Sequence, residues 1–273
     1  MRRGDLVLDL GAGAGALTAP LVNSGARVIA VEADAASASR LRRRFGHANV
    51  TVVEHDLLDV PLSRRAFRVV ASLPFSITTP LLGRLLDPPG ACLERAALVV
   101  EWGAGKRVCD PRPADPRLLW WAARFDLRLR RRVAAENFSP PPAVHAAMLV
   151  AVRRAPPLVP RRDLAPFARL LETAFKSRRA PVAEALAPVF SKRQLCRLLH
   201  DLIVDPQTPI AQMRIEQWTA INTAMIALVD PARWPTARPT WSRASSAGPH
   251  GAGKRSAQRR RGGRGSDQRR RRS

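Results

Sequence analysis

The chain has 273 residues, which is long enough to bury one large or two modest hydrophobic cores. Its 46 basic residues outnumber its 22 acidic residues, and the net charge of +24 predicts a polyanionic partner. Three cysteines and five histidines form no metal-ligand pattern, which argues against a disulfide scaffold and predicts a reduced, cytoplasmic protein without a metal. No apolar stretch reaches the length of a membrane span, and no signal-peptide core follows the first residues, so we expect a soluble chain.

The first predicted element is a strand that runs into a glycine-rich turn and a helix. Apolar residues 6–10 are followed by Gly11, Gly13 and Gly15. Apolar side chains then recur at helical spacing from Ala16 onward. Glycines at such a turn let the main chain approach a ligand closely, and the first amides of a helix lack partners within it. The pattern alone leaves open an ordinary strand-to-helix turn of an α/β domain.

Two further strands end at acidic residues. Residues 28–31 end at Glu32, about twenty residues after the glycines, where doubly wound nucleotide-binding sites place an acid for ribose hydroxyls. Asp34 is a less favoured substitute in this role. Residues 50–54 form the next apolar run, and Asp56 follows it closely.

The rest of the first domain continues to alternate strands and helices. Further strands are predicted from apolar runs at residues 69–72, 96–101, 125–133 and 145–153. Helices are predicted at residues 35–45 and 78–86. The glycine, proline and charge content of residues 102–117 predicts a loop there. This order predicts a mostly parallel sheet with helices on both faces.

After residue 155 the pattern changes to helices alone. Asp163 is the expected N-cap of a helix whose apolar stripe begins at Leu164, and two more helices are predicted near residues 192–202 and 211–229. Beyond them, apolar side chains become too sparse for a core. The chain is therefore predicted to have three parts: an α/β domain over residues 1–155, a small helical domain over residues 156–232, and a disordered Arg- and Gly-rich tail over residues 233–273.

Five motifs occur in a fixed order between residues 4 and 229, namely DLGAGAG, VEAD, EHD, SLPFSITTP and NFSPPPAVHAAML. Together they resemble the ribosomal RNA adenine dimethyltransferase superfamily. Within it they are most similar to the Erm-type methyltransferases, which modify one adenine of 23S ribosomal RNA and confer resistance to macrolides, lincosamides and streptogramins. The resemblance implies a Rossmann-like sheet that binds S-adenosylmethionine. It implies this cofactor rather than NAD, whose fingerprint would place the third glycine one residue later.

The chemistry that the resemblance implies is methylation of an adenine exocyclic amine, whose lone pair is delocalised into the ring. Hydrogen-bond acceptors must hold this amine so that its lone pair points at the sulfonium methyl group of the cofactor. In the family these acceptors are the Asn that opens an NLPF-like motif and the next main-chain carbonyl, and Ser72 and Leu73 stand at these positions. The resemblance also implies that Pro74 stiffens the loop and that Phe75 and Phe138 cover the two faces of the base.

Cofactor binding is implied for residues that follow or end the first four strands. These residues are Asp9, Gly11, Ala12, Gly13, Gly15, Glu32, Ala33, Asp56, Leu57 and Ser72.

Two departures from the family pattern bear on activity. Ser72 replaces the Asn of the motif, and its shorter hydroxyl offers a different geometry, so we expect slower methylation and the transfer of one methyl group. Members of the family also carry a segment with a GQNFL-like motif ahead of the first strand, over the methionine end of the cofactor. Here that strand begins almost at Met1, so we expect either a truncated chain or a cofactor pocket that lacks one wall.

Basic side chains gather in three places that could bind RNA. The first is a strand that alternates apolar and basic residues, with Arg128, Arg130, Arg131 and Arg132. The second is the end of a helix, with Lys176, Arg178 and Arg179. The third is the tail, with Arg259, Arg260 and Arg261. The resemblance implies 23S ribosomal RNA as the partner, either free of protein or in a partly assembled large subunit, and the chain is expected to be a monomer.

Two alternative functions remain open on the sequence. The first is the small-subunit dimethyltransferase of the same superfamily, which serves ribosome assembly. The second is a non-catalytic RNA-binding relative with the same fold. Ser72 and the expected lack of an upstream segment favour this second alternative, whereas the intact DLGAGAG motif, Glu32 and Asp56 oppose it.

Overall fold

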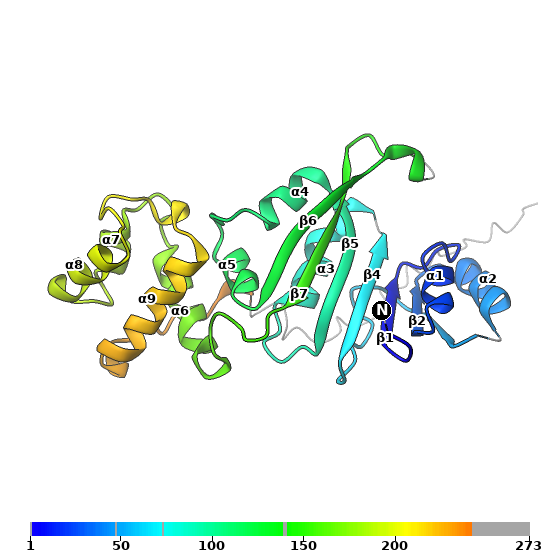
Figure 1. The fold of residues 1–273 in the computed structure, drawn as a ribbon, viewed down its shortest axis with the longest axis horizontal. Coiled ribbons are helices and arrows are strands. Elements are labelled where there is room, and N and C mark those ends of the chain that lie inside the picture. The colour runs from blue at the N-terminus through cyan, green and yellow to red at the C-terminus, as the bar shows by residue number, and fades with distance from the viewer. Residues whose placement is uncertain (1, 47, 73, 139–140, 242–273) are drawn as a thin grey trace, which may run out of the picture.

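The computed structural model describes residues 2–46, 48–72, 74–138 and 141–241. Within these ranges one seven-stranded sheet has the order β3-β2-β1-β4-β5-β7-β6 (Figure 1). The first five strands run parallel, and β7 is antiparallel to its neighbours β5 and β6. The strands are β1 Leu6–Leu10, β2 Arg27–Glu32, β3 Val50–Glu54, β4 Phe67–Ser72, β5 Leu93–Glu101, β6 Phe125–Val133 and β7 Ala146–Arg153.

Helices cover both faces of the sheet, as predicted. On one face, α1 and α2 lie against β1 and β2, where Leu21 packs on Val7 and Val28. On the opposite face, leucines of α3 share a core with Leu8 and Leu10, and this core continues into α4 and α5. The bounds of these helices are α1 Thr18–Asn23, α2 Ala35–Phe45, α3 Thr78–Leu86, α4 Trp102–Val108 and α5 Pro116–Ala122.

The prediction of a loop over residues 102–117 holds for residues 109–115 and is wrong for the rest, because residues 102–108 form α4 and residues 116–117 begin α5. Packing overrides the poor helix propensity of Gly105. A Cβ atom at Gly105 would lie 2.6 Å from Cδ1 of Leu129 and 3.2 Å from Cγ2 of Val100, so glycine lets α4 lie close against the sheet. Asp115 then caps α5, since its carboxylate accepts a hydrogen bond from the Arg117 amide at 2.8 Å.

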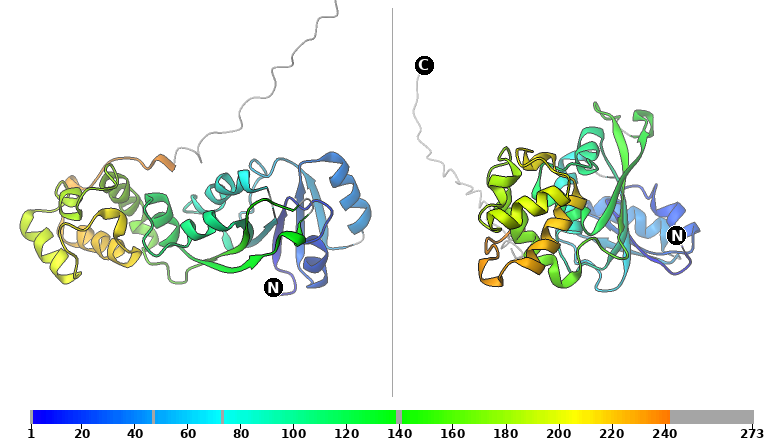
Figure 2. Two further views of the ribbon diagram at one scale, coloured as in Figure 1. Left: turned by 90° about the horizontal axis from the view of Figure 1, so that it is seen from above. Right: turned by 60° about the vertical axis from the view of Figure 1, so that its left-hand side comes forward.

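The C-terminal part is helical, also as predicted, and lies end to end with the sheet (Figure 2). Trp218 is fully buried at its centre and packs on Phe175, with ring centroids 5.5 Å apart. The helices are α6 Leu164–Ala174, α7 Val182–Leu186, α8 Lys192–Asp201 and α9 Ile215–Leu228. Short 3-10 helices join the elements of the chain as η1 Phe75–Ile77, η2 Ala135–Asn137, η3 Arg161–Asp163, η4 Ile210–Gln212 and η5 Pro231–Arg233.

Two details of the predicted helical part differ in the structure. Asp163 precedes α6, but its side chain makes no capping hydrogen bond, because the residue already closes η3. Trp241 is only 6% exposed and belongs to the hydrophobic core, so the packed chain extends past the predicted boundary at residue 233. No helix within the described ranges is both long and apolar enough to cross a membrane.

A buried polar cluster joins the end of α3 to α5. Asp87 is 4% exposed and accepts hydrogen bonds from Nε and Nη2 of Arg117, at 2.9 and 2.6 Å, and from Nε1 of Trp121, at 2.8 Å. Arg124 donates to the main-chain carbonyls of Leu86 and, at 3.0 Å, Pro88. Its positive charge therefore lies at the carboxyl end of α3, where the helix dipole favours a cation.

We expect Asp87→Ala to lower the free energy of unfolding by about 3 kcal/mol, because the half-buried guanidinium of Arg117 would lose its counterion and the buried Nε1 of Trp121 its acceptor. Urea denaturation followed by far-UV circular dichroism measures this loss. Asp201→Ala is the matched control, since that carboxylate is 65% exposed on α8, and it should change stability by less than about 0.5 kcal/mol. Equal losses in the two variants would contradict a special role for Asp87.

Candidate active site

A cavity of about 630 Å³ lies at the carboxyl ends of β1 and β4. Parallel strands β1 and β4 are neighbours although β2 and β3 separate them in the chain, so the connections that leave them diverge to opposite faces. Asn137, Phe138 and Pro142 close a further side. The cavity is lined by Asp9, Gly11, Ala12, Gly13, Ala14, Ala16, Leu17, Ser72, Pro74, Phe75, Asn137, Phe138 and Pro142.

The glycine turn forms one wall of this cavity. Gly13 has a φ of +53°, and a Cβ atom there would meet nothing within 4 Å, so the main chain faces open space. Gly15 serves a different purpose, because a Cβ atom there would lie 2.6 Å from the ring of Phe45 in α2. The structure thus places Gly11 and Gly13 at the cavity and Gly15 at a helix contact, and α1 begins at Thr18 rather than at Ala16.

The side chain of Asp9 lines the cavity, and one of its carboxylate oxygens is unpaired among the described residues. The residue is fully buried, and Thr18 donates a hydrogen bond to Oδ2 at 2.6 Å. Within the described chain, Oδ1 has no hydrogen-bond partner. Burial raises the pKa of Asp9 to about 6, with the hydrogen bond from Thr18 opposing and the charge of Glu32 adding to this effect. An orphaned acceptor of this kind suits the ammonium group of an amino-acid ligand.

The two other predicted acids lie at the ends of neighbouring strands, outside the residues that line the cavity. Glu32 closes β2 and turns back to the glycine turn, where it accepts a hydrogen bond from the Gly13 amide at 2.8 Å. Its other oxygen accepts from the Asp34 amide at 3.0 Å. Asp56 is exposed after β3 and accepts from the Leu58 amide at 2.7 Å. Cofactor binding by these acids, and by their neighbours Ala33 and Leu57, stays a prediction.

The second wall carries the residues expected to hold the base. Ser72 is the last residue of β4, and Pro74 and Phe75 begin the 3-10 turn that leads into α3. Phe138 reaches the same cavity from the loop before β7 and is half-buried. Leu73 falls outside the described residues.

Five lining residues were missed from the sequence, namely Ala14, Ala16, Leu17, Asn137 and Pro142. Ala14, Ala16 and Leu17 continue the glycine turn, and Asn137 and Pro142 stand in the NFSPPPAV motif beside Phe138, so their positions next to predicted residues were the available signal.

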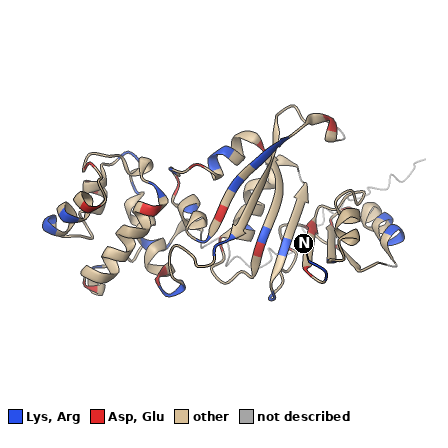
Figure 3. Ribbon diagram, viewed as in Figure 1, with Lys and Arg blue, Asp and Glu red and all other residues tan. Residues whose placement is uncertain are grey.

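The basic residues expected to contact RNA lie on two elements. Basic residues, blue in Figure 3, lie along the upper part of β6. The exposed arginines of this strand are Arg128, Arg130, Arg131 and Arg132. Of these, Arg128 pairs with Asp126 at 2.5 Å, and the guanidinium of Arg132 stacks over the Trp102 ring at 4.6 Å. The predicted tail group Arg259, Arg260 and Arg261 lies outside the described residues.

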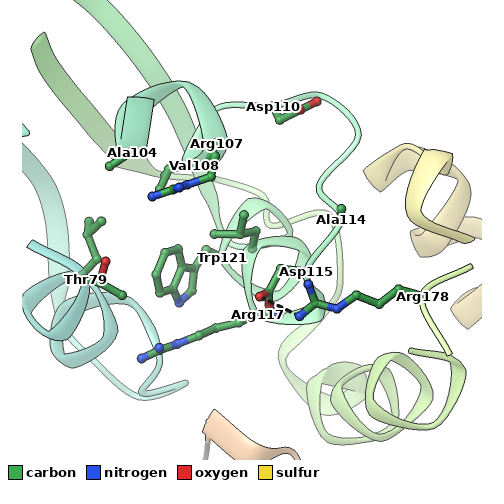
Figure 4. Close-up of a pocket in the computed structure, with 12 residues that line it drawn as sticks. Thr79, Ala104, Arg107, Val108, Asp110, Ala114, Asp115, Arg117, Trp121 and Arg178 are labelled. Carbon is green, nitrogen blue, oxygen red and sulfur yellow. Dashed lines mark hydrogen bonds and ion pairs between the residues drawn. The ribbon is translucent and has the colours of Figure 1, made fainter. Parts of the chain in front are cut away.

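Lys176, Arg178 and Arg179 are exposed on the connection between α6 and α7. From there Arg178 reaches across to Asp115 at 3.5 Å, at the edge of a second cavity of about 340 Å³ between α3, α4 and α5 (Figure 4). These positions make RNA contact sterically available, and the contact itself stays a prediction.

The sheet order, the glycine turn and the adjoining cavity define a Rossmann-like domain with a ligand site at its topological switch point. Comparison with known proteins makes the assignment specific. The family model described as "Ribosomal RNA adenine dimethylase" matches residues 1–226, so the chain belongs to the ribosomal RNA adenine dimethylase family.

Individual relatives agree with this assignment. The rRNA adenine N-6-methyltransferase of Bacillus licheniformis is 32% identical over 234 residues, which cover 85% of this chain and 82% of the relative. The ribosomal RNA small subunit methyltransferase A of Thermosynechococcus vestitus is also 32% identical, over 81% of this chain and 86% of the relative. Among solved structures, the 23S rRNA methyltransferase ErmE superposes with a TM-score of 0.75 at 26% identity, over 83% of this chain and 93% of that chain.

The chain is therefore an S-adenosylmethionine-dependent rRNA adenine methyltransferase. The cavity fits the cofactor in two respects, because the open main chain at Gly13 admits a ligand and the orphaned oxygen of Asp9 matches the ammonium group of its methionine part. Among the described residues, no group of three or more His, Cys, Asp or Glu side chains is arranged to hold a metal ion.

The raised pKa of Asp9 predicts a pH-dependent stability. Between pH ~4 and pH ~6 the folded chain binds more protons at Asp9 than the unfolded chain, so the stability of the ligand-free protein falls as the pH rises. Raising this pKa from 3.8 to about 6 corresponds to about 3 kcal/mol. Asp9→Asn should therefore match the wild type at pH ~4 and exceed its stability by up to about 3 kcal/mol at pH ~7.5. Chemical denaturation at a series of pH values measures both curves.

The same carboxylate should couple cofactor binding to pH. The wild type should bind S-adenosylhomocysteine, which retains the ammonium group, more tightly as the pH rises through about 6, whereas Asp9→Asn should bind weakly at every pH. Isothermal titration calorimetry between pH ~5.5 and pH ~7.5 tests this. A pH-independent affinity in the wild type would show that Asp9 does not contact the ligand.

Proposed function

We propose that this chain methylates the exocyclic amine of one adenine in 23S ribosomal RNA, in the cytoplasm, and thereby confers resistance to macrolides, lincosamides and streptogramins. The observation that carries the proposal is that Ser72, Phe75 and Phe138 share one cavity with the glycine turn. A base that enters between the two rings would have its edge next to the ligand held by that turn. An enzyme of this class needs both partners in one cavity.

The residues of the cavity divide the chemical work. When bound, S-adenosylmethionine would supply an electrophilic methyl group, and the amine that receives it would release one proton to solvent. Phe75 and Phe138 would stack on the two faces of an extruded adenine, which is worth about 1 to 3 kcal/mol per contact. The Ser72 hydroxyl would accept a hydrogen bond from the amine and so aim its lone pair at the methyl group. Asp9 would hold the amino-acid end of the cofactor.

The choice of the large-subunit RNA is supported by the likeness to ErmE, which extends over 93% of that chain. Small-subunit RNA is the second candidate substrate, because the small-subunit enzyme of Thermosynechococcus vestitus is 32% identical to this chain, the same percentage as the relative from Bacillus licheniformis. In either case the RNA would lie against the exposed arginines of β6 and against Lys176 and Arg179. Both candidates use the same cavity, so the RNA that is methylated must be measured.

Transfer of labelled methyl groups to protein-free 23S and 16S ribosomal RNA distinguishes the two candidates. We expect label on a single adenine of the 23S RNA, and Ser72→Asn should increase the rate because the longer amide restores the acceptor of the family motif. Primer extension locates the modified base. Label confined to 16S RNA would support the small-subunit function. Absence of label from both RNAs, in the wild type and in the variant, would contradict catalysis.

Phe75→Ala tests the stacking role directly. We expect kcat/KM for RNA to fall by about tenfold to a hundredfold, because the base loses one of its two stacking partners. The affinity for S-adenosylhomocysteine should stay within about twofold of wild type. Radiolabel transfer and calorimetry measure the two quantities. Val144→Ala is the control, since Val144 is 46% exposed within the motif NFSPPPAVHAAML and does not line the cavity. A parallel loss of ligand affinity in Phe75→Ala would assign this ring a structural role.

A further inference from the structure

A cavity of about 350 Å³ is lined by four arginines and lies near the start of β5, at the end of the strands opposite the active site. It lies between the connection that precedes β5, the end of β7 and η3. Because β5 begins here and the active site stands at the ends of β1 and β4, the two cavities lie at opposite ends of the strands. The lining residues within the described chain include no acid: they are Pro89, Gly90, Ala91, Cys92, Arg124, Arg153, Arg154, Pro157, Arg161 and Leu164.

Three of these guanidinium groups are fixed by main-chain carbonyls rather than by carboxylates. Arg153 donates from Nε to Leu93 at 2.7 Å and from Nη2 to Ala91 at 2.5 Å. Arg154 donates from Nε to the carbonyls of Ala122 and Phe125, at 2.9 and 3.2 Å. Arg124 is 2% exposed, and each of its three guanidinium nitrogens donates to a main-chain carbonyl. Carbonyls orient a guanidinium without cancelling its charge, and among the described residues none of these three arginines forms an ion pair with a carboxylate.

Donors remain that could contact a ligand. Among the described residues, Nη1 of Arg153 and both Nη atoms of Arg154 take part in no hydrogen bond or ion pair, and the same holds for the whole guanidinium of Arg161. Asp87 pairs with Arg117 and Glu94 with Arg68, although the charge of Asp87 also acts on Arg124 and that of Glu94 on Arg153. Burial lowers the pKa of Arg124 to about 9, with the charge of Arg153 adding to this effect and the charge of Asp87 opposing it. An anion in the cavity would relieve this repulsion.

We propose that this four-arginine cavity binds a phosphate group, at a site separate from the methyl-transfer cavity. Fixed guanidinium forks match the geometry of phosphate oxygens and give charge-assisted hydrogen bonds. The phosphate could belong to a free phosphate compound or to an RNA backbone, because both present the same oxygens. The proposal stands on the cavity alone and does not require methyl transfer.

Binding of inorganic pyrophosphate to the full chain tests this site. We expect saturable binding in calorimetry at ~0.15 M salt, and Arg161→Gln should weaken it about tenfold, the loss of one charge-assisted contact. Arg162→Gln is the matched control, because this neighbouring arginine is 86% exposed and lies outside the cavity lining. The control should bind within about twofold of wild type. Absence of saturable binding, or an equal loss in both variants, would overturn the proposal.

Two further measurements complete the test. Pyrophosphate should raise the melting temperature of the wild type and of Arg162→Gln more than that of Arg161→Gln, since a ligand that binds only the folded chain stabilises it. RNA affinity then identifies the source of the phosphate. A larger loss of RNA affinity in Arg161→Gln than in Arg162→Gln, with competition by pyrophosphate, assigns the site to the RNA backbone. Equal RNA affinities together with intact pyrophosphate binding assign it to a free phosphate compound.

Discussion

The position of β1 between β2 and β4 is the constraint on which the rest of the molecule depends. The chain builds β1, β2 and β3 outward in one direction and then returns to place β4 on the free side of β1. Connections that leave β1 and β4 must therefore pass to opposite faces, and a crevice opens between them. The glycine turn, Asp9 and the loop with Phe75 all border this crevice only because the sheet order reverses there.

Much of this arrangement can be predicted from the sequence, because the periodicity of apolar residues and the positions of glycine and proline indicate local secondary structure well. Residues 50–54 and 125–133 are strands and residues 35–45 are a helix, with the predicted bounds. The failure at α4 has a tertiary cause, since only the contact of Gly105 with Leu129 explains why glycine is tolerated there. The dual use of glycines in the turn is likewise invisible in a motif, which does not reveal that Gly15 packs against Phe45.

The candidate site was predictable where motifs carry its residues and not where packing does. Ser72, Phe75 and Phe138 come from motifs, and they do meet in one cavity. The contrast between the two buried acids was not predictable. Asp87 receives three hydrogen bonds from two side chains, whereas Asp9 receives one and keeps a bare oxygen at the cavity. Both are single acids next to apolar runs in the sequence, and only burial and partners distinguish a structural carboxylate from one available to a ligand.

The hydrophobic core has a mechanical consequence for how RNA can be accommodated. One continuous cluster of buried side chains runs from the sheet through Leu119 of α5 and Leu164 of α6 to Trp218 and Trp241. Parts that are joined only by a polar linker can hinge, but a shared apolar core resists such motion. The sheet and the helical part should thus unfold in a single cooperative transition. In the folded state they should keep a fixed relative position, so the RNA-binding surface should not adjust its shape. A target RNA must then deform to fit the enzyme, so local melting of the RNA becomes part of substrate selection.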